Sequence, residues 1–169
     1  IVEKYKKDKS LEIIIASGDM DTMQLIDDKK VQVYTLKKGI NDTILYDEDA
    51  VVSRFHFTPK FLPDYKGLRG DPSDNIIGIK GIGEKTAEIL ITNFGTIEEI
   101  YKKIKKNEKD FIKAGISPRM IELLKNNEEE ALFSKTLATI RTDAPINFTL
   151  PTKTFWDNIN PKKIEEVFT

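Results

Sequence analysis

The sequence predicts an α/β protein in which part of a parallel sheet is followed by an all-α region. Residues 12–17 read Glu-Ile-Ile-Ile-Ala-Ser, an apolar run typical of a strand buried on both faces of a parallel sheet. Val31–Leu36 alternates as a strand does, and Thr43–Tyr46 fits a further strand. In the second half, helix caps, prolines and glycines replace the strand pattern. We therefore expect a sheet domain in residues 1–75 and a helical subdomain in residues 76–169.

Short helical segments and turns connect the expected strands. Residues 1–7 resemble the amphipathic tail of a helix, and Thr22–Ile26 fits one helical turn. Lys37–Gly39 reads as a turn between two strands. A helix is expected from Asp47 to Phe55, and Thr58 before Pro59 supplies a cap for the next one.

The second half carries four helix-start signals. Gly83 opens a helix that ends at Phe94 before Gly95, and Thr96 with Glu99 forms a capping box. Ser117-Pro118 starts a longer helix, which the polar stretch 125–130 is expected to interrupt. The last helix is expected to start at Asn160-Pro161 and to end near Phe168.

Composition narrows the classes of function. The formal net charge of −1 gives no global basic field, so a nucleic-acid site must be local. The absence of cysteine excludes disulfides and thiolate metal sites, and leaves carboxylates as the obvious metal ligands. No apolar run reaches the roughly 18 residues of a membrane span, so we expect no membrane partner and a cytoplasmic location.

Two pairs of aspartates form the most informative acidic pattern. Asp19 and Asp21 follow the first expected strand, at the edge where open α/β sheets bind ligands. Asp71 and Asp74 lie three residues apart, so they share a face if their turn is helical. Mg²⁺ and Mn²⁺ take oxygen ligands, and two such ions about 3.5–4 Å apart can promote phosphodiester hydrolysis. All four aspartates are therefore candidate metal ligands and catalytic residues.

A structural role suits the same aspartates. Asp commonly caps a helix or turn after a strand or beside Pro and Ser. For Asp19 and Asp21 taken alone, both interpretations stay open. For Asp71 and Asp74, the neighbouring Gly70, Ser73 and Asn75 favour the metal site.

A glycine hairpin follows the second acidic pair. Gly81-Ile82-Gly83 precedes an expected helix, the pattern of a helix-hairpin-helix motif. Glycine lets a phosphate approach the backbone, and the N–H groups at a helix start attract that phosphate. Ile79 and Ile82 are expected to point inward and fix the hairpin. The candidate DNA-binding residues of this segment are Lys80, Gly81, Ile82, Gly83, Lys85 and Thr86.

These motifs occur in a recognisable order. The segments are Ser17–Leu25, Gly70–Asn75, Gly81–Ala87 and Arg141–Asp143. Together they closely resemble the 5′-to-3′ exonuclease domain of bacterial DNA polymerase I, within the wider flap endonuclease family. The resemblance implies a 5′-nuclease (PIN-like) core followed by a helix-hairpin-helix subdomain.

The resemblance also implies roles and partners. Asp19, Asp21, Asp71 and Asp74 match aspartates of a two-metal site for Mg²⁺ or Mn²⁺. The hairpin matches one that binds duplex DNA, and in this family it also holds a monovalent cation, K⁺. The implied reaction is hydrolysis of DNA near a 5′ end or at a 5′ flap, in bacterial replication and repair. A polymerase domain, covalently linked or separate, is an implied partner.

The sequence departs from the family in one large respect. Relatives carry an earlier half with further acidic ligands and a helical arch, which is absent from this sequence. We therefore expect a fragment that binds branched or duplex DNA and lacks competent catalysis by itself.

Two other classes of function remain as alternatives. A non-catalytic DNA-structure-binding module would keep the hairpin and need no metal. A phosphatase of the haloacid dehalogenase type also places an Asp-x-Asp motif after a buried strand, as in Asp19-Met20-Asp21. That class wants Thr or Val where Met23 stands, and it does not account for the hairpin.

Overall fold

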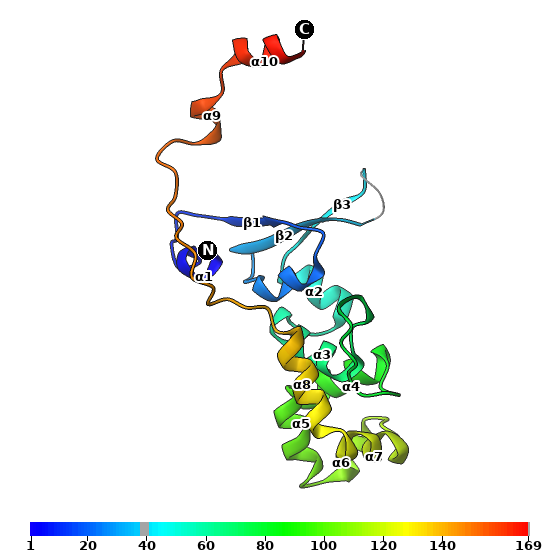
Figure 1. The fold of residues 1–169 in the computed structure, drawn as a ribbon. Coiled ribbons are helices and arrows are strands. Elements are labelled where there is room, and N and C mark those ends of the chain that lie inside the picture. Colours follow the sequence, from blue (N-terminus) through cyan, green and yellow to red (C-terminus); the bar gives the residue numbers. More distant parts are fainter. Residues whose placement is uncertain (38–40, 169) are drawn as a thin grey trace.

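The computed structural model describes residues 1–37 and 41–168. A small sheet with short helices lies at one end of the main body, and a cluster of helices lies at the other (Figure 1). After the last helix of that cluster, the chain runs back as an extended segment and ends in two short helices. The α/β fold with a helical second half is as the sequence predicts.

The described residues form a mixed sheet with the strand order β1-β2-β3. Its strands are β1 (Ile13–Ala16), β2 (Val31–Leu36) and β3 (Thr43–Tyr46). β1 runs parallel to β2, with Ile13 opposite Val31, as predicted. β2 and β3 are antiparallel, with Val33 opposite Tyr46. β3 is antiparallel to β2 because a parallel crossover needs about a dozen residues or more, and the connection from β2 to β3 is shorter.

The prediction that β1 is buried on both faces is wrong. Ile14 is 56% exposed, and the neighbouring Tyr34 and Leu36 on β2 are 44% and 55% exposed. Val31 and Val33, which point to the other face, are fully buried. Within the described residues, only one face of the sheet is covered, so the apolar run of β1 is half-exposed.

Short helical segments precede, connect and follow the strands. They are α1 (Val2–Tyr5), the 3₁₀ turn η1 (Met20–Leu25), α2 (Glu48–Phe55) and the 3₁₀ turn η2 (Pro59–Phe61). The helix predicted from Asp47 to Phe55 is present as α2, and Asp47 caps it by accepting a hydrogen bond from the Ala50 N–H. Thr58 stands at the cap position of η2, but its hydroxyl makes no capping hydrogen bond. Part of the turn predicted at residues 37–39 lies outside the described residues.

The second half is helical, as predicted. Two helical elements already precede residue 76, namely α3 (Leu62–Arg69) and η3 (Pro72–Asp74). The elements that follow are α4 (Glu84–Phe94), α5 (Ile97–Ile104), α6 (Glu108–Lys113), α7 (Pro118–Asn126), α8 (Glu128–Ala138), α9 (Phe155–Asn158) and α10 (Pro161–Phe168). Thr96 and Glu99 form the predicted capping box at α5. The predicted interruption of the longer helix falls at Asn127, which separates α7 from α8.

The extended segment after α8 returns to the N-terminal helix α1. The Lys4 ammonium donates to the Phe148 carbonyl at 2.7 Å, and the Tyr5 and Phe148 rings meet edge to face.

None of the helices in residues 1–37 and 41–168 has the length and hydropathy that a membrane crossing requires.

Helix α3 lies at the centre of a hydrophobic core that continues from the sheet into the helical half. It packs closely against α8 at Gly67, where a Cβ atom would lie 2.9 Å from Lys135 Cβ and 3.0 Å from the Ala131 carbonyl oxygen. The absence of a side chain at Gly67 therefore sets the spacing between α3 and α8.

We expect the Gly67→Ala substitution to lower the free energy of unfolding. The added methyl group would also lie 2.7 Å from Ile97 Cδ1, and overpacking typically costs about 1–3 kcal/mol. The helix preference of Ala returns up to about 1 kcal/mol, so we expect a net loss of roughly 1–2 kcal/mol. Urea denaturation measures this loss. Gly18→Ala is the control because its Cβ would meet nothing within 4 Å; a Gly67→Ala chain as stable as the parent would contradict the packing argument.

Candidate functional site

A cleft of about 410 Å³ opens beyond the carboxyl end of β1. All four predicted aspartates line it: Asp19, Asp21, Asp71 and Asp74. The two acidic pairs, some fifty residues apart in the sequence, therefore face one space. Basic side chains, from Arg54, Lys66 and Arg69, line the same cleft.

Asp19 and Asp21 reach the cleft from the start of η1. Asp19 caps this turn, since its Oδ1 accepts a hydrogen bond from the Asp21 N–H at 2.9 Å. Asp19 therefore has the capping role that was considered as the alternative to metal binding. Gln24 Nε2 donates to Asp21 Oδ1 at 3.3 Å and to the Ala138 carbonyl at 2.8 Å, which ties Asp21 to the end of α8.

Asp71 and Asp74 lie in a tight loop between α3 and the hairpin. Asp71 Oδ1 accepts hydrogen bonds from the Ser73 N–H at 3.0 Å and the Ser73 hydroxyl at 2.5 Å, and so caps η3. The backbones of Asp71 and Ile76 exchange two hydrogen bonds, of 2.8 and 2.9 Å. These bonds close the loop and hold both carboxylates at the cleft.

Two glycines make this loop possible. Gly70 and Gly78 both have positive φ, and their backbones pack directly against each other. A Cβ on Gly78 would lie 2.1 Å from the Gly70 nitrogen. The Gly78 N–H donates to the buried Ser134 hydroxyl at 3.0 Å, which anchors the loop to α8.

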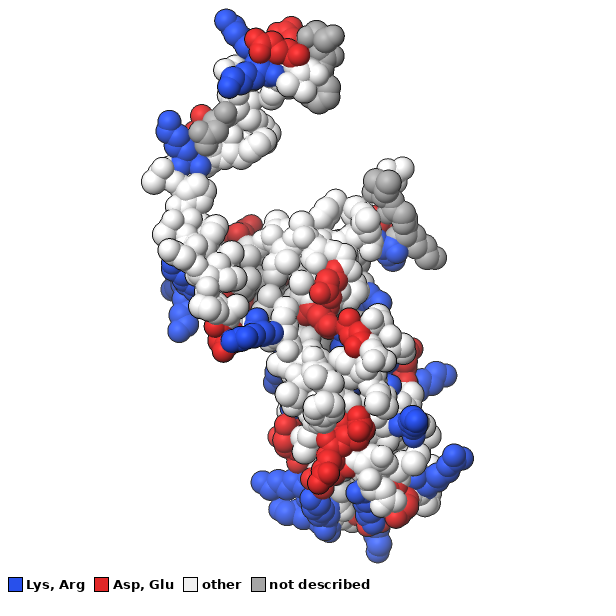
Figure 2. Space-filling view, viewed as in Figure 1, with Lys and Arg blue, Asp and Glu red and all other residues white. Residues whose placement is uncertain are grey.

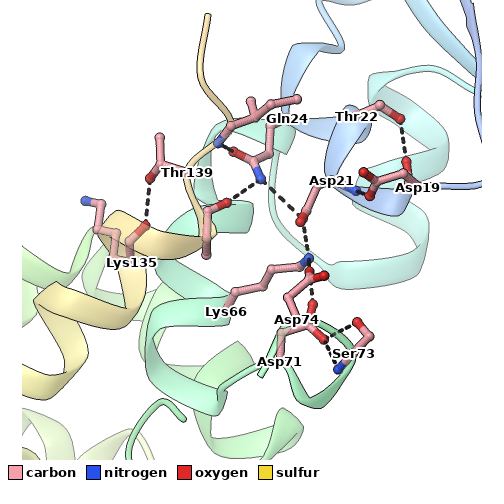
Figure 3. Close-up of polar contacts among 12 residues, drawn as sticks. Asp19, Asp21, Thr22, Gln24, Lys66, Asp71, Ser73, Asp74, Lys135 and Thr139 are labelled. Atoms are coloured by element: carbon pink, nitrogen blue, oxygen red, sulfur yellow. Dashed lines mark hydrogen bonds and ion pairs between the residues drawn. The ribbon is translucent and has the colours of Figure 1, made fainter. Parts of the chain in front are cut away.

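The Lys66 ammonium lies among the carboxylates (Figure 3). It pairs with Asp21 Oδ1, with Asp71 Oδ2 at 2.6 Å and with Asp74 Oδ2 at 3.9 Å. Its side chain is 14% exposed. Asp19 makes no contact with it in the figure. Sequence reasoning missed Lys66, because no motif marks a lysine in the middle of α3.

The ion pairs shift the ionisation of the cluster. Burial opposes the charged form of Asp71, but hydrogen bonds from Lys66 and Ser73 outweigh burial and lower its pKa. Burial likewise opposes the charged form of Lys66, while Asp21 and Asp71 hold its pKa above the usual value. The pKa of Asp74 is raised by partial desolvation and by the negative charges of Asp71 and Asp21.

The arrangement does not fit a bound metal ion as it stands. Four carboxylates are the right donors for Mg²⁺ or Mn²⁺. Yet in residues 1–37 and 41–168 no group of three or more acidic, His or Cys residues is arranged to hold a metal. The Lys66 ammonium takes the position between Asp21 and Asp71 that a cation would need.

The hairpin lies next to the cleft and has the predicted local form. Gly81 adopts φ +100°, whereas Gly83 is extended, with open space where its Cβ would be. Ile79 and Ile82 are 1% and 3% exposed, as predicted. Both side chains therefore anchor the hairpin in the core.

The polar side chains in and around the hairpin differ in exposure and in partners. Lys80 and Lys85 are exposed. Thr86 is half-buried, and its hydroxyl lies 3.5 Å from Met120 Sδ, so it faces α7 as well as solvent. Arg69 pairs with Glu84 at 3.1 Å and so connects the cleft to the first turn of α4.

The surface charge is mixed. Figure 2 shows Lys and Arg gathered mainly over the lower, helical part of the visible face, with acidic side chains among them. A basic site must therefore be local, as the net charge of −1 indicates.

Comparison with known proteins identifies relatives of this chain. Residues 57–161 match the family model "5′-3′ exonuclease, C-terminal SAM fold". The chain is 43% identical over 142 residues to DNA polymerase I of Bacillus caldotenax, covering 84% of this chain and 15% of that protein. It is 38% identical over 137 residues to the 5′-3′ exonuclease of Buchnera aphidicola subsp. Baizongia pistaciae, covering 81% of this chain and 43% of that one.

Solved structures share the fold. The T5 5′-exonuclease with bound zinc superposes with a TM-score of 0.63 at 22% identity, covering 81% of this chain and 45% of that chain. A T5 D15 flap endonuclease variant in complex with DNA and metal ions gives 0.60 at 22% identity, covering 75% of this chain and 42% of that chain. The chain thus spans less than half the length of each of these relatives. Because the family model covers more than half of the sequence, the chain belongs to the 5′-3′ exonuclease family that this C-terminal SAM-fold model describes.

Proposed function

We propose that this region serves a structure-specific 5′ nuclease that hydrolyses DNA near a 5′ end or at a 5′ flap. The observation that carries the proposal is the adjacency of an acidic cleft and a glycine hairpin that leads into an uncapped helix start. Gly70 and Gly78 join the two within one closed loop. Duplex DNA on the hairpin would place a phosphodiester near the cleft.

The hairpin is the proposed DNA-binding element. The start of α4 has no side-chain cap, so its first N–H groups are available to a phosphate. Lys80, Gly81, Gly83 and Lys85 are exposed around it. The backbone of Ile82 and the hydroxyl of Thr86 complete the proposed set, and a nearby K⁺ site stays a prediction.

Asp19, Asp21, Asp71 and Asp74 are the proposed ligands of Mg²⁺ or Mn²⁺. The capping bonds of Asp19 and Asp71 use Oδ1 in both cases. The chemistry we propose is metal-assisted hydrolysis at these carboxylates, although in this structure Lys66 lies between Asp21 and Asp71.

A region with this arrangement is expected to bind DNA without cleaving it efficiently by itself. Lys66 neutralises part of the acidic charge, and the described residues contain no metal-ready group. Such behaviour is what the alternative of a non-catalytic DNA-structure-binding module implies. The phosphatase alternative has no support from the family match.

We expect Gly83→Asp to weaken DNA binding without weakening the fold. Asp is a favourable helix cap, and the extended backbone of Gly83 accepts a side chain without collision. Its carboxylate would repel a phosphate at the same N–H groups, so we expect the dissociation constant for a duplex with a 5′ overhang to rise at least about tenfold. Fluorescence anisotropy measures binding, and urea denaturation measures stability.

Asn107→Asp is the matched control for Gly83→Asp. It adds the same charge at the cap of α6, where Asn107 accepts from the Lys109 N–H. We expect the control to bind DNA as the parent does. Equal losses in both variants would mean that net charge, and not the hairpin, governs binding.

The salt and metal dependence of binding separates the hairpin from the cleft. We expect affinity for the duplex to survive EDTA and to fall steeply with salt, because backbone recognition releases counterions. Lys85→Gln should lower the slope of log K against log salt by about 1. An affinity that disappears in EDTA would place binding at the acidic cleft instead.

We expect the purified chain to cleave a 5′-flap substrate only weakly in Mg²⁺. The physical reason is the ion-paired cluster, which offers no open cation site. A gel assay under single-turnover conditions measures the cleavage. Robust cleavage that is lost in Asp71→Ala would show that the chain is catalytically competent by itself.

A further inference from the structure

Lys66 is the least expected member of the acidic cleft. Its ammonium lies within ion-pair distance of three carboxylates, those of Asp21, Asp71 and Asp74 (Figure 3). The side chains of Lys66 and Asp71 are each 14% exposed, and that of Asp21 is 19% exposed. The pairs of Lys66 with Asp21 and Asp71 are therefore largely shielded from solvent, whereas Asp74 is 51% exposed. Shielded ion pairs are stronger than ion pairs at the surface.

The backbone of Lys66 cannot easily move away. The preceding turn of α3 carries Asp64, whose buried carboxylate pairs with Lys135 at 2.7 Å and accepts from the Ile97 N–H at 2.8 Å. The next residue is Gly67, which packs closely on α8. Any motion that removes the ammonium must therefore come from its flexible four-carbon stem.

The net charge of Lys66 and its three carboxylate partners determines how the cluster interacts with a divalent cation. Three carboxylates and one ammonium carry a formal charge of −2, which attracts a divalent cation. A cation between Asp21 and Asp71 would also meet the Lys66 ammonium in the same space, and the two positive charges repel. Occupancy by lysine and occupancy by metal are therefore mutually exclusive.

We propose that Lys66 is a positioning residue that holds the three carboxylates together in the metal-free protein and competes with the divalent cation for them. This inference rests on the proposed function, because it takes the acidic cleft to be the metal site. Lysine lowers the repulsion among the carboxylates until metal arrives. The cost is a weaker apparent affinity for metal, since each binding event must displace the ammonium.

Direct Mn²⁺ binding tests the competition. Free Mn²⁺ is measured by electron paramagnetic resonance during titration of the parent, Lys66→Gln and Lys66→Met, the second of which keeps the length of the apolar stem. We expect both variants to bind Mn²⁺ about tenfold or more tightly than the parent, which corresponds to one or two relieved ion pairs. An affinity equal to or weaker than that of the parent overturns the proposal.

Thermal unfolding supplies a second readout. In EDTA, we expect Lys66→Met to melt below the parent, because three carboxylates then lack their counter-ion. In saturating Mn²⁺ this deficit should disappear, so the metal-induced rise in Tm is larger in the variant. An equal rise in both chains contradicts the proposal.

Two controls separate the possible failures. Lys105→Gln removes an exposed ammonium that pairs with Glu128 at 2.7 Å, and should leave Mn²⁺ affinity unchanged. Asp71→Asn should abolish binding. If Mn²⁺ binds the parent and Lys66→Gln equally and Asp71→Asn not at all, the metal site stands and the competition fails. If none of the chains binds Mn²⁺, both the metal site and the competition at Lys66 are wrong. The binding experiment with Gly83→Asp tests DNA binding separately from this outcome.

Discussion

The carboxylate of Asp64, which is 2% exposed, lies inside the helical half, where it accepts from the Ile97 N–H and pairs with Lys135. Burial raises the pKa of this carboxyl group, against the effect of its two partners. Separating a buried charge from its partners costs several kcal/mol. These contacts therefore fix helix α3 against α5 and α8.

That fixed helix positions both parts of the proposed site. Lys66 extends from it into the acidic cleft, and Arg69 extends from its last turn to Glu84 at the start of α4. Beyond the helix, the contact of Gly70 with Gly78 brings the chain straight to the hairpin. The aspartate loop and the hairpin are thus neighbours through backbone packing. In the proposed function, this packing would hold a phosphate on the hairpin at a set distance from a cation at the aspartate loop.

Local patterns were sufficient to predict much of this fold. Three predicted features depend on residues close in sequence: the capping box of Thr96 and Glu99, the helix that begins at Asp47 and the strand Val31–Leu36. The half-exposed face of β1 could not be predicted, because an apolar run does not reveal what covers it. The position of Lys66 could not be predicted either, because it depends on Asp21, forty-five residues earlier, and on Asp71, five residues later. The boundary at residue 75 stays a prediction.

The two interpretations of the aspartates, as caps and as metal ligands, are compatible at the level of single oxygen atoms. Asp71 uses Oδ1 to accept from Ser73 and turns Oδ2 toward Lys66. Asp19 likewise uses Oδ1 to cap η1. A capping bond fixes the rotamer of a carboxylate and so lowers the entropy lost when its other oxygen takes a cation. A sequence pattern that favours caps can therefore also prepare a ligand set, and the residue that decides between an ammonium and a metal ion is the lysine, not the aspartates.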